Sequence, residues 1–380
     1  MSKLAVDLMY QPVGGALAQI KEVIKSVESY SFNKVVFYLT KENRYLFDGC
    51  ESKKVVLKFV PFSNTSIVFR TLWVQLLMPF LLIITRVDVL FCPGNISPIF
   101  SFVKKTQWIG TVGPFEPNFI SSFGLKQKIV LFISKYLIIL SSKTSDLVIF
   151  ESNYTRNLFV EKYGQSKDKA AVLYIGNDDY FHPVTPAESI IFANYNRREF
   201  LLTVSHLYPY KNIELLIESF KQMSLKKRGL YLLIAGSIID EPYYERLKGL
   251  LERYGISDHV VFLGRLERSE LKELYSQCKA FVFTSPFENF AYTLVEAMSC
   301  GAPIIATNTT AMPETCGEAA LYFSPNKEEE LSSCISRFLD DEKLRVLYKE
   351  KALIRAEKFD VYSVVNQKTN KLLEGLVDKS

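Results

Sequence analysis

Residues 285–303 read SPFENFAYTLVEAMSCGAP, a stretch that places two carboxylates, Glu288 and Glu296, around an expected helix start. Pro286 fits poorly inside a helix, so the pattern predicts a loop first and a helix that opens near residues 292–294. Glu288 would then project from the loop, and Glu296 would lie within the first two turns. Free backbone N–H groups and the helix dipole at such an opening attract an anion. By itself, a surface loop followed by an ordinary amphipathic helix explains this segment equally well.

The length of 380 residues exceeds what one hydrophobic core usually serves and predicts two domains. With 48% hydrophobic and 23% charged residues, the composition is that of an ordinary globular protein. The six cysteines lack C-x-x-C spacing, so reduced thiols are expected rather than a zinc site or a disulfide framework. The chain enters a strand-like run at 4–9 almost at once, which is too early for a signal peptide and favours a cytoplasmic protein.

Short β-branched or aromatic runs alternate with helical patterns, which predicts α/β domains with parallel sheets. The pattern breaks at 183–198 and then restarts. We therefore expect two Rossmann-like, doubly wound domains, 1–185 and 186–358, that face each other across a cleft. A C-terminal helix at about 360–380 could pack on either domain, including back on the first. Strands are expected at 4–9, 34–39, 55–60, 87–91, 146–150, 171–175, 200–205, 230–235, 260–264, 280–284, 303–306 and 320–323.

A lysine stands just before a predicted helix in the second half of the chain. Lys211 lies in the loop after the strand at 200–205, and Asn212 is a candidate N-cap for the helix that follows. An ammonium beyond the strand end could neutralise a diphosphate, although a lysine there is more often simply solvated. The apolar face of this helix is predicted to comprise Ile213, Leu216, Ile217 and Phe220.

Paired glycines, Gly14 and Gly15, follow the first predicted strand. They would let the backbone approach a ligand closely, but glycine pairs also occur in plain turns. Their spacing is not G-x-G-x-x-G, so a nicotinamide or flavin enzyme is disfavoured and no such cofactor is expected. No D-x-D pair occurs in the sequence, so a metal held by that motif is not expected either.

The net charge of +5 is unevenly distributed, because residues 101–145 carry six lysines against one acid, Glu116. Within 124–143 an apolar stripe follows helical spacing, flanked by Lys128 and Lys135, so this helix could lie on an anionic membrane surface. A core-packing helix with solvated lysines is the alternative. No transmembrane helix is expected, and nucleic acid is a poor partner because no recognised binding motif accompanies the basic residues. The stripe comprises Ile129, Phe132, Ile133, Tyr136, Leu137 and Leu140.

Taken together, these motifs resemble the retaining glycosyltransferases of family 4, which have the two-domain GT-B fold. The resemblance is strongest between residues 200 and 325, and it is loose in the first half of the chain. The matching segments occur in the family's order: SHLYPYKN around Lys211, VVFLG before Arg265, the E-x7-E pair Glu288 and Glu296, and Pro313-Glu314.

The resemblance implies a donor site for a UDP- or GDP-sugar. Glu288 would contact the transferred hexose, Glu296 the ribose hydroxyls, and Lys211 the phosphates. Backbone groups near Asn289, Phe290 and Ala291 are implied to hold the hexose, those at Thr293 and Leu294 the diphosphate, and the segment around Arg265 the base, with Gly14 and Gly15 as further donor-side residues.

Several positions depart from the family's pattern. Ser205 stands where many members carry an arginine that partners the lysine, and Gly113 or a neighbour stands where many carry a histidine. The chain's own histidines do not fit that role, so no side-chain general base is assigned. Asn289 replaces a glycine that usually follows the first glutamate.

The implied reaction moves a hexose to an acceptor hydroxyl with retention of configuration and without a metal. A glycan or a lipid-linked glycan intermediate of a surface polysaccharide is the expected acceptor, which would place the protein at the inner face of the plasma membrane. A catalytically degenerate GT-B protein that only binds sugar nucleotides is the alternative, given Ser205 and the missing histidine. A sugar-nucleotide epimerase or dehydrogenase would need the absent glycine fingerprint, and a non-catalytic sugar-binding protein would not need Lys211.

Overall fold

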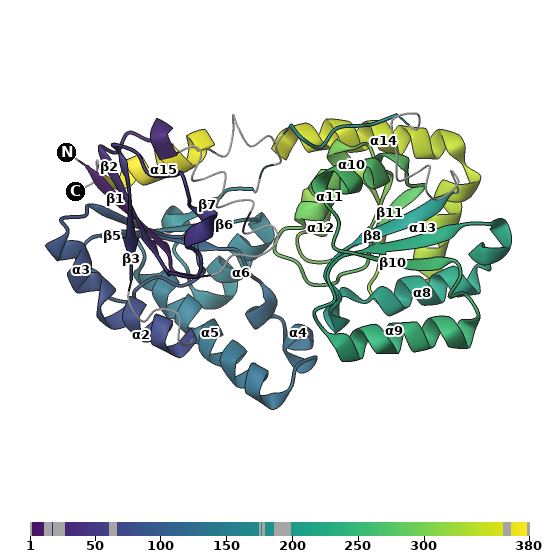
Figure 1. Ribbon diagram of the computed structural model, residues 1–380, viewed down its shortest axis with the longest axis horizontal. Helices are drawn as coiled ribbons and strands as arrows, with labels where there is room; N and C mark the ends of the chain where they lie inside the picture. Colours follow the sequence, from purple (N-terminus) through teal and green to yellow (C-terminus); the bar gives the residue numbers. More distant parts are fainter. Residues whose placement is uncertain are drawn as a thin grey trace. The chain divides into compact units, whose positions relative to one another are not determined.

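The computed structural model describes residues 2–10, 17, 27–60, 67–174, 176, 179–185, 199–359 and 366–377. The chain forms two compact units, Met1–Gly176 together with Val361–Ser380, and Asn177–Asp360. Each unit is built on a parallel sheet with helices packed against it, as Figure 1 shows. The two Rossmann-like sheets predicted from the alternating pattern are thus confirmed.

The first unit contains a seven-stranded sheet in the order β3-β2-β1-β4-β5-β6-β7. Its strands are β1 (Lys3–Leu8), β2 (Lys34–Leu39), β3 (Val55–Phe59), β4 (Val89–Cys92), β5 (Lys104–Ile109), β6 (Leu147–Phe150) and β7 (Ala170–Val172). Its α-helices are α2 (Ile67–Leu76), α3 (Met78–Ile84), α4 (Pro117–Ser121), α5 (Leu125–Thr144), α6 (Asn153–Tyr163) and α15 (Asn366–Val377). Four 3-10 turns accompany them: η1 (Val27–Ser29), η2 (Arg44–Leu46), η3 (Gly113–Phe115) and η4 (Lys167–Lys169).

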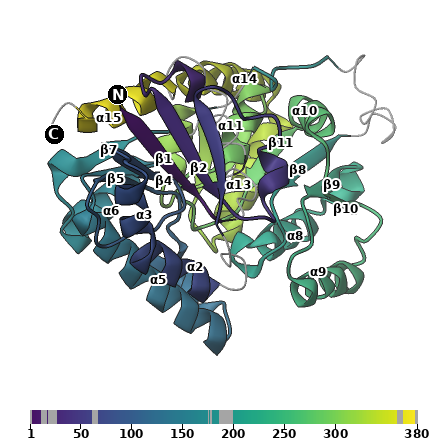
Figure 2. The same cartoon turned by 60° about the vertical axis from the view of Figure 1, so that its left-hand side comes forward.

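Helices cover both faces of this sheet. Val74 of α2 and Leu82 of α3 pack with Ala5 of β1 in one core cluster. The next residue of β1, Val6, packs with Leu373 of α15 in another. Because successive residues of a strand point to opposite faces, α2 and α3 lie on one face and α15 on the other, as Figure 2 also shows. The C-terminal helix therefore packs on the first unit.

The sequence analysis missed β5, which is a polar strand in a buried place. Lys105 and Gln107 are 2% and 0% exposed. The Lys105 ammonium donates to the Ile99 carbonyl (2.9 Å) and to Thr144 Oγ1 (2.7 Å), and burial lowers its pKa to about 8. The Gln107 amide donates to the carbonyl of Ile138 in α5 (3.3 Å). These hydrogen bonds compensate for the cost of burying the polar side chains of β5.

Helix α5 forms where it was predicted, but its apolar stripe faces solvent. Ile138, Ser141 and Ser142 are its buried residues. The core-packing alternative is therefore wrong for the stripe. The sheet beneath α5 presents the polar side chains of Lys105 and Gln107, and the side of α5 that faces them carries hydroxyl groups instead of the stripe. Among the residues described, no helix combines the length and apolarity needed to cross a bilayer. The side chains of the stripe that are 48% to 59% exposed are Ile129, Phe132, Ile133, Tyr136 and Leu140.

The second unit contains a six-stranded sheet in the order β10-β9-β8-β11-β12-β13. Its strands are β8 (Phe200–Val204), β9 (Tyr231–Ala235), β10 (Val260–Gly264), β11 (Ala280–Phe283), β12 (Ile304–Thr307) and β13 (Ala320–Phe323), all within one residue of the predicted bounds. Its α-helices are α8 (Ile213–Gln222), α9 (Glu241–Tyr254), α10 (Arg268–Gln277), α11 (Tyr292–Ser299), α12 (Met312–Cys316), α13 (Glu328–Asp340) and α14 (Glu342–Ala356). Its 3-10 turns are η5 (Pro209–Lys211), η6 (Leu225–Arg228), η7 (Gly317–Ala319) and η8 (Glu357–Phe359).

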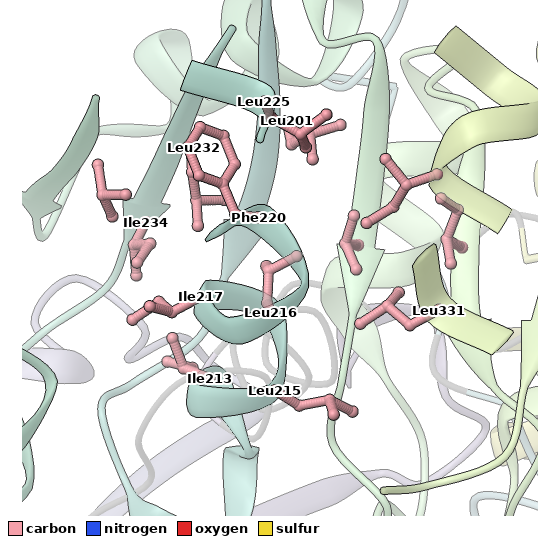
Figure 3. Close-up of a cluster of buried hydrophobic side chains, with 14 of the residues drawn as sticks. Leu201, Ile213, Leu215, Leu216, Ile217, Phe220, Leu225, Leu232, Ile234 and Leu331 are labelled. Carbon is pink, nitrogen blue, oxygen red and sulfur yellow. The ribbon is translucent and has the colours of Figure 1, made fainter. Parts of the chain in front are cut away.

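Helix α8 contributes a continuous apolar face to the core of this unit. The four residues predicted for that face are all fully buried, and Figure 3 shows them beside Leu232, Ile234 and Leu331. Asn212 occupies the N-cap position with φ +54°, but its amide donates to Asn326 Oδ1 (3.2 Å) and does not cap the helix. The predicted side-chain cap is therefore wrong, because the left-handed backbone turns this side chain away from the first turn.

The backbone beyond β8 and β9 is so closely packed that Gly236 has no room for a side chain. Its φ is +141°, and an added Cβ would lie 1.9 Å from the Ser205 carbonyl oxygen. The Gly236 N–H also donates to the Gly264 carbonyl at 2.7 Å. The carboxyl ends of β8, β9 and β10 are thus fixed to one another.

We expect Gly236→Ala to lower the free energy of unfolding of the second unit by roughly 3 kcal/mol, because the methyl group displaces a strand end. The matched control is Gly249→Ala in α9, where an added Cβ meets nothing within 4 Å. This control should gain about 0.5–1 kcal/mol from helix propensity. Thermal unfolding followed by far-UV circular dichroism checks both; equal midpoints for the two variants would contradict the packing argument.

Candidate functional site

Two loops at one edge of the second sheet carry the site. Strands β8 and β11 are parallel neighbours. The chain continues from β8 to β9 on one side and from β11 to β12 on the other. In open α/β sheets, ligands bind beyond the carboxyl ends of the strands at such a switch point. Lys211 follows β8 and Glu288 follows β11, so both predicted residues stand there.

The structure brings Lys211 and Glu288 into direct contact. The Lys211 ammonium donates to Glu288 Oε1, which also accepts a hydrogen bond from Ser285 Oγ (2.9 Å). The two charged side chains are 14% and 18% exposed, so the pair is largely buried yet reachable from solvent. Thr284 Oγ1 donates to the Lys211 carbonyl (2.7 Å) and ties the two loops together.

The surroundings of Lys211 favour its charged form. Burial opposes the charge, but the Glu288 carboxylate and Tyr210 together outweigh it and raise the pKa of Lys211. The ammonium also lies 5.0 Å from the ring centroid of Tyr210. Burial lowers the pKa of His206, and the charges of Lys211 and Arg265 lower it further, which favours a neutral imidazole. Lys211 and Arg265 therefore provide the positive charge at this edge, and the neutral His206 adds none.

Threonines at the end of β12 and just after it hold the Glu288 loop. The Glu288 N–H donates to Thr310 Oγ1 (3.3 Å), and Thr309 Oγ1 donates to the Pro286 carbonyl (2.9 Å). Thr307 Oγ1 donates to the Ser285 carbonyl (2.8 Å). The sequence analysis did not single out these residues, because only the adjacency of β11 and β12 brings them to the loop. The run Asn308-Thr-Thr310 after a strand was the available signal.

Helix α11 begins at Tyr292, so the predicted loop-to-helix boundary is confirmed. Glu296 lies in its second turn, is 8% exposed, and accepts a hydrogen bond from the hydroxyl of Tyr275 in α10 (3.1 Å). Burial raises the pKa of Tyr275 well above its usual value, and the Glu296 carboxylate raises it further. The hydroxyl therefore stays protonated and keeps one carboxylate oxygen bound. Tyr275 was not predicted.

The remaining predicted residues fall into three groups. Asn289, Phe290, Ala291 and Leu294 are buried between the Glu288 loop and the first turn of α11. Ser205 and Arg265 follow β8 and β10 at the same edge as Lys211, and Thr293 lies in the first turn of α11. Gly14 and Gly15 lie outside the described residues. Within the described part of the chain, no cluster of three His, Cys, Asp or Glu side chains could hold a metal ion.

Gly113, which stands near the position where the resemblance implied a histidine, is enclosed. It lies in η3 of the first unit, and an added Cβ would be 2.7 Å from the Phe119 ring. Any side chain at this position would have to displace that ring.

The second unit is similar to proteins described as sugar transferases. Residues 186–355 match the family described as glycosyl transferases group 1. An O-antigen chain mannosyltransferase B of Escherichia coli is 25% identical over 236 residues, which cover 60% of this chain and 61% of that protein. An N-acetylgalactosamine-N,N'-diacetylbacillosaminyl-diphospho-undecaprenol 4-alpha-N-acetylgalactosaminyltransferase of Campylobacter jejuni is 27% identical over 244 residues, 63% of this chain and 64% of that protein. The chain thus spans less than two thirds of the length of these relatives.

Solved structures resemble the chain over nearly its whole length. A glycosyltransferase from Rickettsia africae has a TM-score of 0.77 at 18% identity, covering 100% of this chain and 99% of that one. The fold is GT-B. Anabaena Alr3699/HepE in complex with UDP and glucose has a TM-score of 0.76 at 19% identity, covering 99% and 100%. At these identities the likeness establishes the architecture alone.

We expect Lys211→Met and Glu288→Gln each to lower the free energy of unfolding by about 2–3 kcal/mol, because each leaves a largely buried charge without its partner. The double variant should recover most of that loss. Urea unfolding followed by circular dichroism checks this cycle, while Trp73 and Trp108, which both lie in the first unit, provide a separate fluorescence signal. Additive losses in the double variant would show that the pair is not energetically coupled.

Proposed function

We propose that this protein is a retaining, metal-independent glycosyltransferase of family 4 that moves a hexose from a UDP- or GDP-sugar to an acceptor hydroxyl. The observation that carries the proposal is the Lys211–Glu288 pair at the switch point of the second sheet, beside the start of α11. The cation and the helix N-terminus suit the diphosphate of a sugar nucleotide, and the hydroxyl-binding carboxylate suits its sugar.

Each of these groups has a distinct role in the proposal. Lys211 and the first backbone N–H groups of α11 neutralise the diphosphate and stabilise the charge that develops on it as it leaves. Glu288 accepts hydrogen bonds from hexose hydroxyls, with the backbone of Asn289 to Ala291 alongside. Glu296 accepts hydrogen bonds from the ribose. The segment at Arg265 lies near the base.

The bond that breaks joins the anomeric carbon to the phosphate oxygen, and the acceptor oxygen forms the new bond on the same face. The departing phosphate oxygen takes the acceptor's proton, so the nucleoside diphosphate leaves with the charge balanced and no side-chain base is required. Gly113, which cannot hold a proton, is compatible with this route. The charge on the leaving group is the quantity that Lys211 must stabilise.

The names of the relatives guide the proposed substrates. They include mannosyltransferases of O-antigen chains and a transferase that acts on a diphospho-undecaprenol acceptor. We therefore propose a glycan or lipid-linked glycan of a surface polysaccharide as the acceptor, and action at the inner face of the plasma membrane. Anabaena HepE is described with UDP-glucose, whereas a Mycobacterium tuberculosis relative, 30% identical over 185 residues, is described as GDP-mannose-dependent, so both nucleotides belong in the assay.

A catalytically degenerate protein that only binds sugar nucleotides is the second candidate, favoured by Ser205 at the arginine position. Incubating the purified protein with a panel of UDP- and GDP-sugars and measuring release of the nucleoside diphosphate separates the two. Slow release with at least one donor supports the transferase. Binding of a donor without release of any nucleoside diphosphate, with and without glycan acceptors, would favour the second candidate.

We expect Lys211→Ala and Glu288→Ala to lower turnover by orders of magnitude, because each removes charge or hydroxyl binding needed at the reacting centre. Lys279→Ala is the matched control, since Lys279 pairs with Glu199 (2.6 Å) at the opposite edge of the same sheet. It should retain the wild-type rate. Steady-state kinetics with circular dichroism as a folding check decide the matter; wild-type rates in the two site variants would refute the site.

We expect Tyr275→Phe to raise the KM for the sugar nucleotide about tenfold with little change in kcat. The reason is that Glu296 loses the hydroxyl group whose hydrogen bond orients its carboxylate. A donor analogue that lacks the ribose hydroxyls should show almost no difference between variant and wild type. This comparison separates positioning from general destabilisation, which would affect both donors equally.

A further inference from the structure

The first unit exposes large apolar side chains on two helices that follow one another along the chain. On α2 and α3 they recur every three or four residues, which places them on one side of the helices. The opposite side packs on the sheet through Val74, Met78 and Leu82. The exposed members are Phe69, Leu72, Leu76, Phe80, Ile83 and Ile84, at 47% to 78% exposure.

These helices adjoin α5 and its exposed stripe. Ser97 links them, because its carbonyl accepts from Gln75 of α2 (3.0 Å) and its hydroxyl lies 3.2 Å from that of Ser145, which ends α5. Figures 1 and 2 both draw α2 alongside α5. A pair of exposed phenylalanines extends the surface, since the Phe102 ring packs at a tilt against Phe80 (5.9 Å between ring centroids) and edge-to-face against Phe100 (4.5 Å). We call the surface formed by α2, α3, α5 and residues 100–102 the apolar face.

The charged side chains on the helices of the apolar face are positive, while Asp88 and Asp146 lie at its margin beside Phe102. Neither 67–84 nor 125–144 contains an acidic residue. Lys126 and Lys143 are exposed near the two ends of α5, and Lys128 is partly exposed beside the stripe. Soluble monomers seldom leave so many large apolar side chains together on one side, and such surfaces mark interaction sites.

Two occupants fit an apolar face: a second copy of this chain or a lipid surface. Two copies would bring like-charged lysines toward one another, whereas an anionic bilayer offers opposite charge to the lysines and an apolar interior to the phenylalanines. The helix axes need not enter the bilayer for this, because an interfacial helix buries only its apolar side. Charge complementarity therefore favours lipid.

We propose that the apolar face docks on an anionic lipid bilayer, with α2, α3 and α5 lying along its surface. The lysines supply attraction to the head groups, and the phenylalanines enter the boundary between head groups and acyl chains. The prediction made for α5 from the sequence thus becomes one part of a larger surface that the sequence did not reveal. Docking needs neither donor nor acceptor, so it can be tested apart from glycosyl transfer.

The test is co-sedimentation of the full chain with vesicles of phosphatidylcholine, with and without phosphatidylglycerol. The wild type should bind the anionic vesicles and bind neutral ones much less. Replacing two lysines, Lys126→Gln with Lys128→Gln, should weaken binding roughly 25-fold at low salt, since each cation near an anionic surface contributes about fivefold. Added salt should remove this difference.

Two apolar variants test insertion separately from charge. Phe80→Ser and Phe132→Ser remove exposed rings from α3 and α5 and should each weaken binding to anionic vesicles even where salt screens the lysines. Matched controls lie on α14 of the second unit, where Ile354 is 64% exposed and Lys343 is also exposed. Ile354→Ser and Lys343→Gln should bind like the wild type, and donor hydrolysis should persist in all variants because none touches the proposed site.

Several outcomes would overturn the proposal. Equal binding to neutral and anionic vesicles, or no binding to either, excludes an anionic bilayer as the occupant. Variants of the apolar face that bind like the α14 controls would place any membrane contact elsewhere. Analytical ultracentrifugation covers the rival occupant: a wild-type dimer that Phe132→Ser dissociates, without vesicle binding, would identify the apolar face as an interface between two copies.

Discussion

The parallel pairing of β8 with β11 is the constraint on which the candidate site depends. Because the chain leaves these neighbours in opposite directions, their two following loops open side by side at one sheet edge. Lys211 and Glu288 are 77 residues apart in sequence, yet this pairing places them in contact. The close backbone packing at Gly236 fixes the edge from the other side. A rigid edge lets two side chains of opposite charge meet with little ordering cost.

The site is built from one charged contact and many neutral hydrogen bonds that support it. Hydroxyl groups of Ser285, Thr307, Thr309 and Thr310 hold the Glu288 loop, and the Tyr275 hydroxyl holds Glu296. Each is a neutral donor or acceptor that positions a carboxylate, a carbonyl or a backbone N–H group without adding charge. Because these supporting groups are neutral, the charged side chains at the edge can interact with an anionic ligand without further charges nearby.

In the first unit, the polar strand β5 lies inside the sheet between β4 and β6, and its buried side chains need hydrogen-bond partners. Lys105 and Gln107 on β5 need partners, and the inward side of α5 supplies Thr144 and the Ile138 carbonyl. The helix therefore turns Ser141 and Ser142 inward beside Ile138, and it turns Ile129, Ile133 and its exposed aromatic rings outward. The amphipathic pattern of α5 was correctly recognised as a pattern, but its direction is the reverse of that of an ordinary surface helix. The same burial of polar groups leaves the apolar face exposed.

The sequence by itself determined the order of strands and helices in the second unit, the loop-to-helix boundary at Tyr292 and the inward face of α8, since these follow from local periodicity, proline placement and turn residues. The tertiary structure alone decided that β5 is a strand, that α5 faces outward, and that Tyr275 and the threonines after β12 reach the two glutamates. These outcomes depend on which strands become neighbours and on which buried polar groups find partners. Both are properties of contacts between residues far apart in the chain, and local patterns do not encode them.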